Sequence, residues 1–137
     1  MEILFIASVS VITADPAAGR ALFVDALRLP LRPDDTGAYF HSEGIDGARH
    51  FGVWPLAQAA EACFGTTAWP DDRPVPQASI EFEVRDADAV AGAEQELVDA
   101  GHDLLHPTKT EPWGQTVARF QTADGAIAGI SYAPWLH

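Results

Sequence analysis

The chain repeats one pattern, and this internal repeat restricts its fold more than any other feature of the sequence. Residues 11–27 and 84–101 each read as the end of a strand, an Asp at a helix start and an amphipathic helix. An Asp-Gly turn that leads into an apolar strand follows each stretch, at 46–47 and at 124–125. The two spacings agree to within one short loop, so we expect two copies of one module in a pseudo-symmetric fold.

The repeat predicts an α+β fold made of two βαβββ modules with mostly antiparallel sheets. The modules are expected over residues 1–68 and 77–137, with the linker 69–76, rich in proline and aspartate, between them. Helices are expected to start at Asp15 and Asp86, and a third helix is expected over 56–64. The strands are expected over 2–13, 38–43, 48–54, 77–84, 102–105, 115–122 and 127–133, with a short strand within 29–37.

Composition places the chain among soluble globular proteins. Hydrophobic residues make up 47% of the 137 residues and charged residues 20%, which is ordinary for a folded domain. No apolar run reaches the roughly 18 to 20 residues that span a bilayer. The chain starts with an apolar stretch that carries Glu2 and lacks the basic region of a signal peptide. We therefore expect a cytoplasmic protein whose first residues form a strand.

The balance of charges argues against nucleic acid as a partner. Twenty acidic and eight basic residues give a net charge of −12, which repels phosphates and attracts cations. The single cysteine, Cys63, excludes an internal disulfide and a cysteine-rich zinc site, and its apolar surroundings favour a buried packing thiol over a reactive one. No Gly-x-Ser-x-Gly, Walker or metalloprotease motif is present, so nucleophilic catalysis has no support.

Several of these features together resemble the vicinal-oxygen-chelate superfamily, which includes glyoxalase I, extradiol dioxygenases and the bleomycin-resistance proteins. The resemblance rests on the strand-Asp-helix pattern at Asp15 and Asp86, on the turn Phe-Gln-Thr-Ala-Asp-Gly at 120–125 and on Glu-Pro-Trp-Gly at 111–114. It implies that each module curls into a half-open sheet and that two modules face each other around a cavity. It also implies a homodimer, in which modules can be swapped between two chains.

Enzymes of that superfamily hold a divalent metal on the cavity face with His, Gln or Glu side chains. The resemblance implies that the corresponding positions here are Ser8, Phe51, Ser79 and Gly129. None of these residues is a usual metal ligand, so we expect no metal, no cofactor and no catalytic residue. A register shift of one residue would replace Phe51 by His50, and a metal improvised from His50, Glu81 and another group is the alternative.

A cavity without metal ligands leaves room for a bulky guest. Alternation along the strands places hydroxyls, a phenyl ring and a carboxylate on one face, while tryptophans next to loops offer flat surfaces for stacking. The alternative for each tryptophan is a structural plug, and for His41 a hydrogen-bonded strand histidine. The candidate ligand-binding residues are Ser8, Ser10, Phe40, His41, Phe51, Trp54, Trp69, Ser79, Glu81 and Trp113.

These observations favour a non-catalytic protein that sequesters an antibiotic or another aromatic natural product in a cavity at the module or dimer interface. The bleomycin- and mitomycin-resistance members of the superfamily act in this way, and an intercalating peptide antibiotic would suit such a cavity. One alternative is a metal-dependent enzyme of glyoxalase or dioxygenase type with atypical ligands. A second alternative is a regulatory or stress module that mainly dimerises and has a vestigial cavity.

Overall fold

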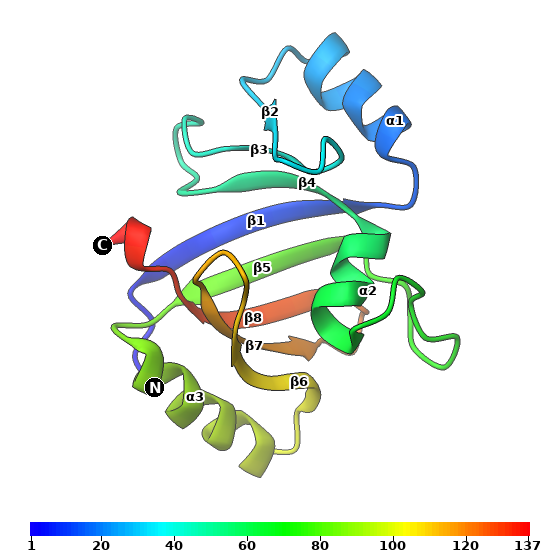
Figure 1. Ribbon diagram of the computed structural model, residues 1–137. Coiled ribbons are helices and arrows are strands. Elements are labelled where there is room, and N and C mark those ends of the chain that lie inside the picture. Colours follow the sequence, from blue (N-terminus) through cyan, green and yellow to red (C-terminus); the bar gives the residue numbers. More distant parts are fainter.

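The computed structural model describes residues 1–137 and shows one open, mixed sheet of eight strands with three α-helices (Figure 1). The strand order across the sheet is β2-β3-β4-β1-β5-β8-β7-β6. The strands are β1 (Phe5–Thr13), β2 (Arg32–Pro33), β3 (Phe40–Ser42), β4 (Phe51–Pro55), β5 (Ala78–Glu83), β6 (Asp103–Thr110), β7 (Thr116–Gln121) and β8 (Ile127–Tyr132). The predicted α+β fold of two βαβββ modules is confirmed.

The two modules meet at the centre of the sheet. Strands β1 and β5 pair antiparallel there, with Ser8 opposite Glu81 and Ser10 opposite Ser79. Within each module the outer neighbour of the central strand runs parallel to it, β4 beside β1 and β8 beside β5. A pseudo-twofold relation that exchanges Ser8 with Ser79 therefore also exchanges Ser10 with Glu81.

Both predicted helix starts are confirmed as side-chain caps. In α1 (Pro16–Arg20), Asp15 Oδ1 accepts a hydrogen bond of 3.1 Å from the Ala18 N–H. In α3 (Ala87–Asp99), Asp86 Oδ1 accepts one of 2.8 Å from the Ala89 N–H. An Asp at this position satisfies a backbone donor that the helix leaves free, which is why the pattern could be read from the sequence.

The three helices lie on different parts of the sheet. Helix α2 (Leu56–Phe64) packs on one face, with Trp54, Ile127 and other apolar residues of that face. Helix α3 covers the opposite face of the second module, where Val84 and Ile130 are buried. Helix α1 and the π-helical turn after it, Ala21–Ala26, stand beside β4 with most side chains exposed. None of the helices has the length and apolar character needed to cross a bilayer.

Some elements differ from those expected in length. The strand expected within 29–37 is only the two residues of β2, because prolines and adjacent aspartates around it limit pairing. The strand expected over 102–105 continues to Thr110 as β6, with two irregularities where it pairs with β7. Cys63 is buried in the α2 core, and burial raises the pKa of its thiol to about 11, which agrees with a packing role.

Candidate functional site

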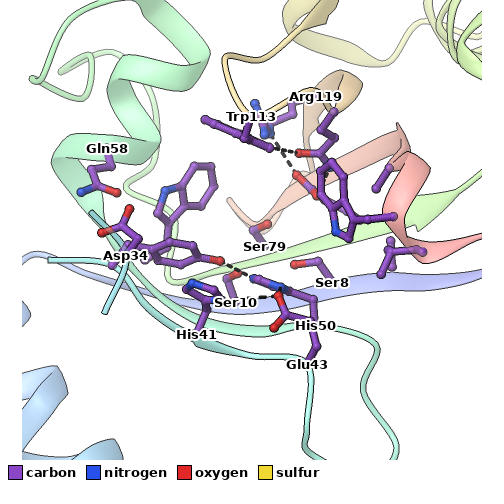
Figure 2. A pocket seen from close by; sticks show the side chains of 18 residues that line it. Ser8, Ser10, Asp34, His41, Glu43, His50, Gln58, Ser79, Trp113 and Arg119 are labelled. Atoms are coloured by element: carbon purple, nitrogen blue, oxygen red, sulfur yellow. Dashed lines mark hydrogen bonds and ion pairs between the residues drawn. The ribbon is translucent and has the colours of Figure 1, made fainter. Parts of the chain in front are cut away.

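A cavity of about 390 Å³ lies on the α2 face of the sheet and is lined by 18 residues from both modules (Figure 2). Its floor holds the hydroxyls of the two central strands, Ser8, Ser10 and Ser79. One wall comes from the first module, with His41 and His50, and the other from the second module, with Trp113 and Arg119. This volume falls within the usual range for small-molecule sites, about 300 to 1,000 Å³.

Seven of the ten residues predicted from the sequence line this cavity. They are Ser8, Ser10, His41, Trp54, Ser79, Glu81 and Trp113. Alternation along β1 and β5 predicted correctly that the serines and Glu81 face the cavity. The one irregularity in the pairing of these strands lies between residues 6 and 8, so the register from Ser8 onward is regular.

Three of the predicted residues lie elsewhere, and the expectation that they face the cavity is wrong. In β4, Trp54 lines the cavity and Gly52 faces Tyr39 of its wall, so Phe51 points to the other side, with its ring centre 6.0 Å from that of Phe23. Phe40 is buried beneath Arg20, whose guanidinium carbon is 5.7 Å from the ring centre. A shift of one residue in the assumed register accounts for Phe51, because side chains alternate along a strand.

Trp69 is a structural residue rather than a wall of the cavity. It packs edge-on against Phe64, with ring centres 5.0 Å apart, and its indole N–H donates a 2.9 Å hydrogen bond to the Pro74 carbonyl. It therefore fastens the segment that connects the modules to α2, which is the plug that the sequence left open as an alternative.

The tryptophans that do line the cavity differ in exposure. Trp113 is 53% exposed and Trp135 is 52% exposed, although both line the cavity. Trp54 is buried, with the Arg119 guanidinium carbon 5.4 Å from its ring centre. The two exposed indoles are therefore the groups with the most free ring surface for a guest, and Trp135 was not among the residues predicted.

A buried ionic network holds the second-module wall. Arg119 donates to Glu81 at 3.2 Å and to Glu111 at 2.7 Å, and Gln115 donates to the other oxygen of Glu81 at 2.7 Å. Although burial disfavours its charge, the carboxylate of Glu81 raises the pKa of Arg119 further above its ordinary value. The Trp113 indole N–H donates to Gln115 at 2.9 Å, which extends the network to the exposed ring. Glu81 is thus a paired carboxylate that positions the wall.

His106 belongs to the same network but lies behind the wall. Its Nδ1 is 2.8 Å from the Pro107 carbonyl and its Nε2 is 3.2 Å from an Arg119 nitrogen. Since Arg119 can only donate, His106 carries its proton on Nδ1 and accepts at Nε2. Burial, together with the charges of Arg119 and Lys109, lowers the pKa of His106 to about 4. The imidazole is therefore neutral in the network.

A polar and aromatic cluster forms the first-module wall. The rings of Tyr39, His41 and His50 contact one another: the His41 ring centre lies 5.1 Å from that of Tyr39 and 5.2 Å from that of His50, and the last two are 6.0 Å apart. The Tyr39 hydroxyl lies 2.5 Å from His50 Nε2, and Glu43 Oε1 lies 2.9 Å from His50 Nδ1. Burial lowers the pKa of His50 and raises that of Tyr39. Tyr39 and Glu43 were not predicted, although the spacing of 39, 41 and 43 is that of one strand face.

Comparison with known proteins finds similar structures but no similar sequence. No family model and no curated protein matches the sequence. The structure is similar to that of a glyoxalase/bleomycin resistance protein/dioxygenase superfamily member from Vibrio splendidus, with 14% identity, a TM-score of 0.57, and 93% of this chain and 97% of that chain covered. The chain has the fold of this superfamily.

Two further solved structures share the fold. One is an NAD-dependent benzaldehyde dehydrogenase from Legionella pneumophila, with 14% identity, a TM-score of 0.62 and 90% and 96% of the two chains covered. The other is a methylmalonyl-CoA epimerase from Streptomyces coelicolor in complex with 2-nitronate-propionyl-CoA, with 12% identity, a TM-score of 0.55 and 99% of both chains covered. At these identities the likeness shows the fold alone, because one fold hosts many chemistries.

The metal positions of the superfamily do not suit a metal in this chain. The register places Gly52 opposite Ser10 and Gly129 opposite Glu81, so Gly52, and not Phe51 as expected, occupies the place in the first module that Gly129 has in the second. A Cβ at Gly52 would lie 2.5 Å from the Tyr39 hydroxyl, and one at Gly129 would lie 2.8 Å from Glu81 Cγ. Neighbouring side chains therefore fill both places, and Ser8 and Ser79 offer only neutral hydroxyls.

Proposed function

We propose that this protein binds a small molecule with a flat aromatic part in the cavity and sequesters it without changing it chemically. The observation that carries the proposal is the pair of half-exposed indoles, Trp113 and Trp135, at a cavity of about 390 Å³. Rings held at a cavity in this way suit stacking on a planar guest, and the serine hydroxyls of the floor suit its polar edges.

The charges of the lining favour a cationic guest. Asp34 and Glu43 line the cavity, and the only arginine or lysine in the lining, Arg119, is 1% exposed and already paired with Glu81 and Glu111. Glu43 is partly paired with Arg32, whereas Asp34 makes no ion pair, so the unpaired charge that a guest meets is negative. The net charge of −12 acts in the same direction at longer range.

Isothermal titration calorimetry on EDTA-treated protein tests this proposal. The probes are aromatic dyes of opposite charge, with ethidium as the cation and an anilinonaphthalene sulfonate as the anion. We expect saturable binding of the cationic dye near one per cavity, with quenching of tryptophan fluorescence and weaker binding of the anionic dye. A broad panel of planar compounds that produces no saturable heat and no quenching contradicts the proposal.

Substitutions locate the binding in the cavity. The double variant W113L/W135L should weaken binding by about 5- to 150-fold, since each aromatic pair contributes about 0.5 to 1.5 kcal/mol beyond area burial. The control W69F removes an indole outside the cavity and should leave the affinity unchanged. The guest recovered from the complex should be chemically intact, and a new product would indicate an enzyme instead.

A further inference from the structure

The first-module wall carries three donor atoms that face one another. His41 and Glu43 come from β3 and its end, and His50 directly precedes β4, so the antiparallel pairing of the two strands brings the three residues together. Figure 2 shows His41, Glu43 and His50 side by side, across the cavity from Trp113. We propose that these three residues bind a divalent transition metal of the zinc type, through Nδ1 of each histidine and Oε1 of Glu43.

The spacing of the donor atoms suits a single small ion. Glu43 Oε1 lies 2.9 Å from His50 Nδ1 and 3.4 Å from His41 Nδ1, and all three donor atoms lie within 4.8 Å of one another. Ligands at zinc bond lengths of about 2.0 to 2.1 Å are about 3.4 Å apart at the edges of a tetrahedron. An ion therefore fits among these atoms with small side-chain adjustments.

One of the three atoms lacks a partner in the chain. His41 Nδ1 is the single buried side-chain nitrogen or oxygen in the structure that makes no hydrogen bond. Its contact with Glu43 has a distance of 3.4 Å but not the geometry of a hydrogen bond. Buried polar groups are nearly always satisfied, so this nitrogen requires a further partner. A bound cation supplies one for the lone pair of Nδ1 in the tautomer that carries its proton on Nε2.

Neighbouring side chains orient the proposed ligands, as residues around the ligands of a metal site commonly do. The Tyr39 hydroxyl lies 2.5 Å from His50 Nε2 and fixes the ring with Nδ1 toward Glu43. A metal-bound histidine commonly donates its second N–H to such an oxygen. Arg32 contacts the other oxygen of Glu43, Oε2, at 3.5 Å, which leaves Oε1 for the ion.

The donor set and its place define what kind of site this is. Two imidazoles and one carboxylate are a common set for zinc and for other first-row metals, and three protein ligands leave a position open. All three residues line the cavity, so the open position is accessible to a guest there. The site uses one module only, and it includes none of Ser8, Phe51, Ser79 and Gly129, the positions that the resemblance to the superfamily implies.

Metal titration of the EDTA-treated protein, without any organic guest, tests the site. We expect Zn²⁺ to bind at one per chain in calorimetry and native mass spectrometry, and Co²⁺ to produce visible absorption bands that Zn²⁺ removes. H41Q, E43Q and H50Q should each weaken binding at least tenfold, and Y39F about tenfold through the orientation of His50. The matched controls H102Q and E61Q change exposed residues outside the cluster and should bind as the parent does.

Two results would overturn the site. One is the absence of stoichiometric Zn²⁺ or Co²⁺ binding to the parent protein, and the other is binding that H41Q and H50Q leave unchanged. Circular dichroism verifies that each variant folds, and anomalous diffraction at the zinc edge locates the ion in the parent protein without any substitution. Because the dye titrations use metal-free protein and the metal titrations use no dye, either proposal can fail while the other stands.

Discussion

Gly52 is the residue whose size decides the shape of the first-module wall. Because Gly52 has no side chain, the Tyr39 ring can pack directly against its backbone. The Tyr39 hydroxyl in turn contacts Nε2 of His50 and fixes its ring. The sequence shows this glycine in a strand, where glycine often marks the close approach of another group. The close approach itself becomes visible only when β3 and β4 are paired.

The substitution G52A should destabilise the protein and disturb this wall. An added Cβ would lie 2.5 Å from the Tyr39 hydroxyl, so the ring has to move. We expect a loss of about 1 to 3 kcal/mol in the free energy of unfolding, measured by urea denaturation. The control G92A adds a methyl group on the exposed face of helix α3 with no atom within 4 Å, and it should raise the free energy of unfolding by about 0.5 to 1 kcal/mol. Equal stabilities for the two variants would contradict this account.

His106 makes stability depend on pH in a defined window. Its pKa in the folded protein is about 4, below the ordinary value of 6.5, so the unfolded chain takes up the proton first as the pH falls. The contribution of neutral His106 to the free energy of unfolding is complete above about pH 6.5 and is lost as the pH falls from there to about 4. One pKa unit corresponds to about 1.4 kcal/mol, so the loss is about 3 kcal/mol.

A comparison with H106Q isolates this contribution. Glutamine retains an acceptor for Arg119 and does not titrate. The unfolding free energy of the parent protein minus that of H106Q should therefore decrease as the pH falls from 6.5 to 4. Urea denaturation at several pH values measures it. A constant difference across this range would show that His106 is protonated in the folded protein.

At the scale of elements, the two copies of the module use the same signals with different consequences. Asp15 and Asp86 cap their helices in the same way, yet α3 buries Val90 and Ala93 whereas α1 buries only Gly19. Local patterns predict where a helix begins, because capping involves neighbours in sequence. How much of the helix the sheet covers depends on packing between distant residues.

This difference predicts unequal effects of removing the two caps. D86A should lower the unfolding free energy by about 1 kcal/mol, because fraying of α3 loosens a packed helix. D15A should lower it by less, because α1 adds little burial that depends on its first turn. Thermal denaturation of the two variants side by side measures both effects. A larger effect of D15A would mean that α1 is packed more firmly than its exposure indicates.

At the scale of the whole molecule, the outer face of the central strands has no helix over it. Ile6 of β1 is 52% exposed and Ile80 of β5 is 37% exposed, between α1 on one side and α3 on the other. Leu22 and Leu27, in and after the helical segment that follows α1, are also more than half exposed. Exposed apolar residues on an uncovered sheet face often mark an interface, so we predict that the face with Ile6 and Ile80 forms the homodimer expected from the sequence.

Sedimentation velocity tests the dimer. We expect a dimer at micromolar concentration for the parent protein and a shift toward monomer for I6E/I80E, because a charge buried at an interface is costly. V98E changes an exposed apolar residue on α3 and serves as the control. A monomeric parent protein would contradict the prediction and leave this apolar face to another partner.

The sequence by itself determined the modules, the helix starts and the serine floor. Capping, turns and alternation involve residues close in the chain, so they can be read before any tertiary contact is known. Only the tertiary structure decided which residues form the walls. Phe51 faces away because the side of a strand residue depends on a register set by pairing, and a single residue of shift reverses it. His41, Glu43 and His50 meet for the same reason, since the distance between two strands is set by the hydrogen bonds that join them.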